Sequence, residues 1–233
     1  DDFRTASALV QNFNPLTRQA VTFWTYALAI PNGVLLADET ALRETAETLE
    51  LAERNGDNAT LFVARWARGV TLIHRGGHDR AQGLELLASI RDDASLVPWS
   101  LLTLPVADAY LAQESARIGD FDSAVGLSRR ALETLNESGR SIWCGFATTV
   151  LVETLLQRGG STDLGDAQLL VDRLAAVPTD PGFVLHDITL LRLCALLARA
   201  RGDEAGYRDL RDRYRAMAND LGFEGHMAMA AGM

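Results

Sequence analysis

Two histidines four positions apart, His74 and His78, have the spacing of a metal site. Two imidazoles at this spacing lie on one face of a helix, where they can bind zinc. Here Gly76-Gly77 separates them, and a glycine pair is expected to end a helix. No cysteine or third ligand lies near them in the sequence. We therefore interpret the segment as a turn with an exposed His78, and we predict no metal ion.

A second group with chemical potential is acidic. Four glutamates lie close together in the sequence: Glu39, Glu44, Glu47 and Glu50. Such a group could form a cation site or a pair of catalytic carboxylates. However, Glu39 stands four residues before Arg43, the favourable orientation for an ion pair on an exposed helix. Glu50 and Arg54 repeat this spacing, so we predict a solvated helix face.

The basic residues exclude several kinds of catalysis. All 22 are arginine, and the sequence contains no lysine. A Walker A phosphate loop, a Schiff-base lysine and a kinase phosphate-pairing lysine each require the missing ammonium group. No clustered set of titratable residues replaces them. We therefore expect a chain that is not an enzyme, with no catalytic residue and no cofactor.

Three arginines and two tryptophans are candidates for binding a partner. Arg65, Arg68 and Arg75 lie on one side of a predicted helix, about half a turn from its apolar residues. They either face carboxylates of a neighbouring helix or line a groove that binds an acidic partner. Trp24 and Trp99 likewise either pack in the core or anchor a partner in the groove.

Glycines that could close helices recur at a nearly constant step. They are Gly33, Gly76, Gly119, Gly159 and Gly202, separated by 43, 43, 40 and 43 residues. Most precede an acidic residue and a run with apolar residues at i, i+3, i+4 and i+7. No sustained strand alternation is present. This pattern predicts an all-α protein, a right-handed α-solenoid of about five antiparallel, tetratricopeptide-like helix pairs.

The glycines also predict the bounds of the helices. The more apolar first helix of each pair is expected at residues 15–29, 59–75, 99–118, 141–158 and 183–201. The repeat units then span residues 15–57, 58–98, 99–140, 141–180 and 181–222. Residues 1–14 are predicted to be the remnant of a preceding pair, and residues 223–233 a C-terminal tail. All of these parts are expected to belong to one domain, residues 1–233.

The net charge and the cysteine content limit the partners and the cellular location that we expect for the chain. A formal charge of -9 opposes binding to nucleic acid and to anionic membranes, so neither is an expected partner. Cys144 and Cys194 lie far apart in apolar helical stretches, which favours reduced thiols and a cytoplasmic location. The start at Asp1 has neither an initiator methionine nor a leader pattern, so we expect a piece of a larger protein.

Two segments resemble known families. The turn Gly119-Asp120-Phe121-Asp122-Ser123-Ala124 resembles the turn between the helices of a tetratricopeptide repeat. The segment Leu221-Gly222-Phe223-Glu224-Gly225-His226-Met227-Ala228-Met229 resembles the ending of large actinobacterial, especially mycobacterial, signalling proteins. In that family a class III adenylate cyclase domain often precedes a P-loop regulatory ATPase and a C-terminal helical-repeat region. No catalytic residue carries over, because the cyclase and ATPase motifs lie outside this chain.

The resemblance implies a regulatory module. In the related ATPases, helical repeats inhibit the ATPase or bind an inducer or a partner protein. We therefore expect a protein-interaction module that binds a protein or peptide partner, including domains of its own polypeptide. The alternative is a sensor that binds a small-molecule inducer in the concave groove, which requires a roomy pocket with convergent polar groups.

Overall fold

The computed structural model describes residues 5, 9, 15–93, 100–138 and 141–233, and this part of the chain is helical, with no strand. The predicted all-α class is therefore confirmed. Most of the predicted remnant at residues 1–14 lies outside the described residues. The candidate anchor Trp99 also lies outside them. Among the helices that are described, none combines the length and the apolar content needed to cross a bilayer.

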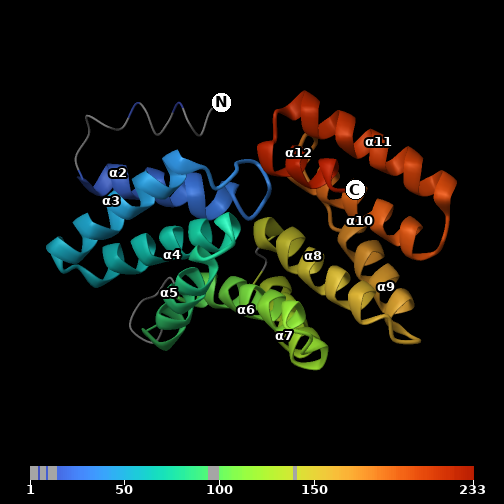
Figure 1. Ribbon diagram of the computed structural model, residues 1–233, viewed down its shortest axis with the longest axis horizontal. Helices are drawn as coiled ribbons and strands as arrows, with labels where there is room; N and C mark the ends of the chain where they lie inside the picture. The colour runs from blue at the N-terminus through green and yellow to red at the C-terminus, as the bar shows by residue number, and fades with distance from the viewer. Residues whose placement is uncertain (1–4, 6–8, 10–14, 94–99, 139–140) are drawn as a thin grey trace. The chain divides into compact units, whose positions relative to one another are not determined.

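Two compact units make up the chain: residues 1–101 with 223–225, and residues 102–222 with 226–233. The first unit contains α2 (Pro15–Thr22), the π-helix η2 (Phe23–Leu28), α3 (Glu39–Asn55), α4 (Asn58–Arg75) and α5 (Asp79–Asp93) (Figure 1). Helix α6 (Ser100–Arg117) begins at the boundary. The second unit continues with α7 (Phe121–Glu137), α8 (Ser141–Arg158), α9 (Asp163–Ala175), α10 (Val184–Ala200) and α11 (Glu204–Leu221), and it contains most of α12 (Glu224–Ala231).

Consecutive helices pack against each other inside each unit. In the first unit α4 contacts both α3 and α5. In the second unit α8 contacts α7 and α9, and α10 contacts α9 and α11 (Figure 1). Because short turns join these helices, each is antiparallel to its neighbour in sequence. Helix α8 also contacts α10, so these two predicted first helices lie next to each other.

Left-handed glycines end helices where the sequence predicts them. Gly33, Gly76, Gly119, Gly159 and Gly202 have φ values of 67°, 76°, 88°, 67° and 74°. A side chain would be strained in this conformation, which explains why glycine recurs there. After two of these turns the side chain of an aspartate caps the next helix. Asp120 accepts a hydrogen bond from the backbone N–H of Ser123 at 3.2 Å, and Asp203 accepts one from Gly206 at 2.9 Å.

The observed helix bounds agree closely with the predicted first helices, with two local differences. Residues 15–29 form an α-helix that widens into a π-helical turn from Phe23 to Leu28. The 3.6-residue apolar pattern does not distinguish such a turn from an α-helix. The predicted tail also contains a helix, Glu224–Ala231. Its short apolar run has no polar face to mark it as amphipathic.

Several aromatic residues and the two cysteines lie in or near the interior. Trp66 and Tyr110 are fully buried, and the ring of Tyr110 lies 4.8 Å from that of Phe146. Cys144 is buried and Cys194 half-buried, and both carry free thiols. Burial raises the pKa of both thiols, so they stay protonated at neutral pH. The prediction of reduced thiols agrees with this arrangement.

Helices α4 and α5 cross closely because both contribute a glycine at the contact. A Cβ atom added to Gly83 of α5 would lie 2.7 Å from the carbonyl oxygen of Gly69 in α4. It would also lie 2.8 Å from the backbone nitrogen of Ile73. Real Cβ atoms do not come this close to backbone atoms, so the two helices would have to separate.

We therefore predict that Gly83→Ala destabilises the chain. Overpacking costs about 1–3 kcal/mol, and it outweighs the roughly 0.5–1 kcal/mol that alanine gains over glycine within a helix. Urea unfolding measures the change. Gly126→Ala in α7 is the matched control, since its new Cβ would meet only the side-chain tip of Arg130 at 3.6 Å. The control should be slightly stabilised, and equal effects of the two variants would contradict the close crossing.

Candidate functional site

Two of the three predicted binding arginines contact the neighbouring helix α3. The half-buried guanidinium of Arg68 donates to the backbone oxygen of Leu42 at 2.7 Å, and it lies 3.4 Å from Thr45 Oγ1. Burial lowers the pKa of Arg68, and the charge of Asp79 opposes this shift. Arg75 forms an ion pair with Glu39 at the start of α3. The Arg75 contact corresponds to the predicted alternative in which the arginines face carboxylates of a neighbouring helix, whereas Arg68 contacts a backbone carbonyl and a hydroxyl there.

The Arg75 contact corrects the predicted pairing within α3. Glu39 pairs with Arg75 of α4 across the helix pair, where the i, i+4 spacing predicted Arg43. Helices α3 and α4 are antiparallel, so the end of α4 comes to the beginning of α3. Spacing rules describe one helix at a time and do not include this approach.

The other predicted site residues of the first unit differ in their exposure. Arg65 is half-buried on α4, and Trp24 is 53% exposed on η2, edge-on to Phe23. His74 and His78 are exposed where α4 ends and its turn begins. Across the described residues, no group of three or more histidine, cysteine, aspartate or glutamate side chains could hold a metal ion.

The second unit contains a groove that the sequence analysis did not predict. Its volume is about 250 Å³, and it lies over α8 between α7 and α9. Helix α7 contributes Arg129, Leu132, Glu133 and Asn136, helix α9 contributes Asp166, Leu169, Leu170 and Arg173, and helix α8 contributes Leu151. Each of the two flanking helices therefore presents an i, i+3, i+4, i+7 stripe, one face over two turns.

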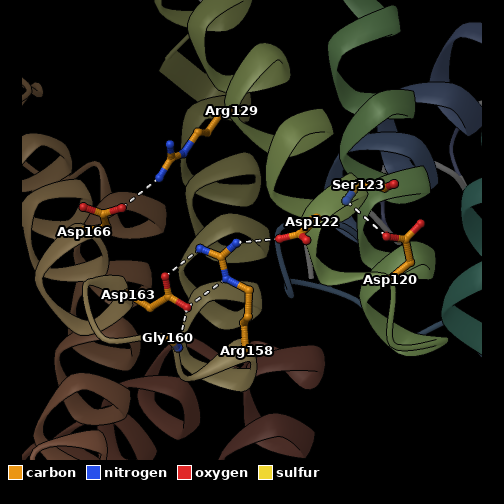
Figure 2. Close-up of polar contacts among 8 residues, drawn as sticks. All are labelled: Asp120, Asp122, Ser123, Arg129, Arg158, Gly160, Asp163 and Asp166. Atoms are coloured by element: carbon orange, nitrogen blue, oxygen red, sulfur yellow. Dashed lines mark hydrogen bonds and ion pairs between the residues drawn. The ribbon is translucent and has the colours of Figure 1, made fainter.

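The two stripes of the groove are in register. Every α7 position has a counterpart 37 residues later on α9, from Arg129 and Asp166 at one end to Asn136 and Arg173 at the other. At the first end Arg129 and Asp166 form an ion pair of 2.8 Å across the groove (Figure 2). This pair closes one end of the groove and cancels the charge there.

A second arginine connects the helices that form the groove. Arg158, at the end of α8, binds both oxygens of Asp163 at 2.9 Å and 2.6 Å and reaches Asp122 of α7 at 3.0 Å (Figure 2). Asp163 also accepts the backbone N–H of Gly160 at 2.8 Å. The side chain of Asp163 is only 2% exposed, whereas that of Asp122 is 94% exposed. One guanidinium thus links α7, α8 and the start of α9.

The same kind of contact occurs in the first unit. Arg75 and Arg158 each stand directly before a left-handed glycine, and each binds an acidic residue 36 positions earlier. In both cases the partner, Glu39 or Asp122, lies in the first turn of the preceding helix. The 36-residue spacing is close to the 37-residue spacing of the groove stripes, and it identifies equivalent positions in two helix pairs.

The unpaired charges of the groove are Glu133 on α7 and Arg173 on α9. Both are exposed, and neither forms an ion pair or a side-chain hydrogen bond with another described residue. Between them lie the buried side chains of Leu132 and Leu151 and the 56% exposed side chain of Leu169. An apolar surface with one acidic and one basic flank suits recognition of another polypeptide.

A buried polar cluster holds the last helix, α12, against α11. His226 of α12 lies with its Nδ1 2.7 Å from the hydroxyl of Tyr214 in α11, which also donates to the His226 carbonyl at 3.2 Å. Burial raises the pKa of Tyr214, and an ion pair between Arg192 and Glu153 lies near enough to affect it. Tyr214 and His226 are almost completely buried, so this cluster holds α12 in place.

Sequence reasoning missed the groove because each of its residues fits an ordinary helix surface. Comparing helices 37 residues apart, position by position, would have aligned the stripe from Arg129 to Asn136 with the stripe from Asp166 to Arg173. The unpaired state of Glu133 and Arg173 depends on side-chain packing, which the sequence alone does not give.

Comparisons of the chain with protein-family models, with curated proteins and with solved structures find no match. The described residues define the class of protein, an all-α protein of successive packed helices.

The Arg158 contacts yield a stability prediction. Asp163→Asn is expected to lower the free energy of unfolding by about 1.5–3 kcal/mol, because it removes a charged partner from a hydrogen-bonded, buried position. Asp122→Asn is the matched control, since it removes a carboxylate that contacts the same arginine. Its effect should be much smaller, because solvent screens an exposed ion pair. Urea unfolding measures both variants. Equal losses of unfolding free energy would show that burial of the carboxylate does not determine its contribution to stability.

The difference between wild type and Asp163→Asn should also depend on pH. The hydrogen bonds from Arg158 are the main cause that lowers the pKa of Asp163, despite its burial. A carboxyl group whose pKa is lower in the folded state stabilises the fold above its unfolded pKa, about 3.9. That contribution disappears as the pH falls through the lower, folded pKa. The two proteins should therefore become more alike in stability below about pH 4.

Proposed function

We propose that this chain is a non-catalytic regulatory module that binds a protein or peptide partner, within a larger cytoplasmic signal-transduction protein. The observation that carries the proposal is the α7–α9 groove, with its apolar floor and two unpaired charges of opposite sign. An apolar surface flanked by charged side chains is typical of a site that recognises another polypeptide chain. In the absence of a partner Leu169, on the α9 side of the groove, is 56% exposed.

The dimensions of the groove favour a polypeptide over a small metabolite. Small-molecule sites are usually enclosed cavities of roughly 300–1,000 Å³, lined by aromatic residues and convergent polar groups. The groove is smaller, at about 250 Å³, and leucines and long charged side chains line it. It therefore suits one or two side chains of a partner better than a whole inducer, so the sensor remains the weaker hypothesis.

The proposed architecture is a right-handed, tetratricopeptide-like solenoid of about five helix pairs. The recurring left-handed glycines support this proposal, as does the repeated contact made by Arg75 and Arg158. The contact between α8 and α10 also supports it, because stacked hairpins place their first helices against each other. A stack of this kind presents long surfaces to partners.

The resemblance to actinobacterial signalling proteins suggests where the partner lies. We propose that the module binds the adenylate cyclase domain or the P-loop ATPase domain of its own polypeptide and thereby regulates it. Acidic charge on the chain, -9 overall, does not favour nucleic acid or anionic lipid as the partner. Direct binding between separately produced parts of the polypeptide tests this proposal.

The first functional prediction concerns Leu169. Leu169→Asp should weaken binding of the chain to the cyclase and ATPase domains at least tenfold, because it places a charge on the apolar surface of the groove. Titration calorimetry measures the affinity. Ile118→Asp is the matched control: Ile118 is 68% exposed in the same unit but does not line the groove. Equal weakening by both variants, or unchanged affinity with Leu169→Asp, would contradict a partner site in the groove.

The second functional prediction tests the arginines of α4. If they form a second contact with the partner, Arg65→Ala should weaken the same binding about three- to tenfold. The guanidinium of Arg68 donates to the Leu42 carbonyl, so replacing Arg68 also removes a contact within the fold. Arg68→Ala serves as the comparison and should lower the thermal unfolding temperature. Unchanged affinity with Arg65→Ala rejects the arginine hypothesis and leaves the groove as the binding surface.

A further inference from the structure

We infer that the α7–α9 groove binds a helical segment with one large apolar side chain, flanked by a carboxylate and a basic group. The carboxylate pairs with Arg173 on α9, and the basic group pairs with Glu133 on α7. This inference rests on the proposed function, because it names the chemistry of the partner in the same groove.

The apolar side chain has a defined place. Leu132 and Leu151 are buried beneath the groove, and Leu169 and Leu170 stand on its α9 side. A leucine or phenylalanine from a partner would remove Leu169 and Leu170 from water, and burial of this kind is the main source of affinity in such contacts. The small volume allows one such anchor.

The charges of the groove select what flanks the anchor. Arg129 and Asp166 already neutralise each other at one end of the groove. The remaining charges are Arg173, whose planar guanidinium can bind a carboxylate with two hydrogen bonds, and Glu133, which accepts from a lysine or arginine. Since the two stand on opposite flanks, the complementary segment carries one charge of each sign.

A helix fits this arrangement better than an extended strand. The groove runs along two helical turns of α7 and α9, about 10 Å at 1.5 Å per residue. Both walls are helices whose backbone groups bond internally, so an extended peptide would find no free backbone edge to pair with. An amphipathic helix presents its anchor and its flanking charges at i±3 and i±4 positions on one face, as helix-in-groove recognition requires.

Three synthetic helical peptides test the inference, identical except for the residues four positions before and after a central leucine. The first carries aspartate and lysine, the second two aspartates and the third two lysines. Fluorescence anisotropy at low salt measures their affinities for the whole chain. The wild type should bind the mixed peptide about three- to tenfold more tightly than the other two. This comparison does not depend on the direction in which the peptide lies.

Two charge reversals should change the order of affinities in opposite ways. Arg173→Glu makes both flanks acidic, so this variant should prefer the peptide with two lysines. Glu133→Arg makes both flanks basic, so it should prefer the peptide with two aspartates. Arg130→Glu is the control for overall charge, because Arg130 is exposed on α7 but does not line the groove. The control should keep the order of the wild type, and circular dichroism verifies that each variant is folded.

The same order of affinities in all four proteins would overturn the inference, because the groove charges would then have no part in selection. Failure of all three peptides to bind would overturn it as well. The proposed function is judged separately, by binding of the cyclase and ATPase domains. If those domains bind and Leu169→Asp weakens them while no peptide binds, partner recognition by the groove stands and the proposed helical segment is wrong.

Discussion

The contact between Arg158 and Asp163 is the interaction on which the geometry of the groove depends. A buried carboxylate is costly unless it is paired and hydrogen-bonded, and Asp163 receives two bonds from Arg158 and one from the backbone of Gly160. The same guanidinium reaches Asp122 on α7. The start of α9 is thereby fixed to the end of α8, and the exposed contact with Asp122 brings the start of α7 to the same guanidinium.

Much of the helical framework can be predicted from the sequence because its determinants are local. A glycine such as Gly119 adopts a conformation that other residues avoid, and Asp120 directly after it supplies the side-chain acceptor that begins the next helix. These effects depend on a few neighbouring residues. The apolar stripe of each helix likewise depends on a fixed period, so the positions of most helices follow from the sequence with small errors at their ends.

The candidate site cannot be predicted in the same way, because it arises between helices. Glu39 satisfies a local rule with Arg43, yet it pairs with Arg75, which the antiparallel turn brings to it. Glu133 and Arg173 are ordinary exposed residues in sequence, and they become a pair of flanks only when α7 and α9 lie over α8. The π-helical turn from Phe23 to Leu28 is a further case, since the same apolar pattern fits an α-helix.

Arg68 and Arg173 differ in their surroundings because of the helices on which they lie. On α4, a first helix in contact with helices on both sides, Arg68 is half-buried and its hydrogen bonds go to the neighbouring helix α3. On α9, a second helix with one face in solvent, Arg173 has no such neighbour and stays exposed. A guanidinium already bonded inside the fold must break that bond to bind a partner, whereas an unpaired one loses only water. The balance of free energy therefore favours Arg173 over Arg68 as a contact for a partner.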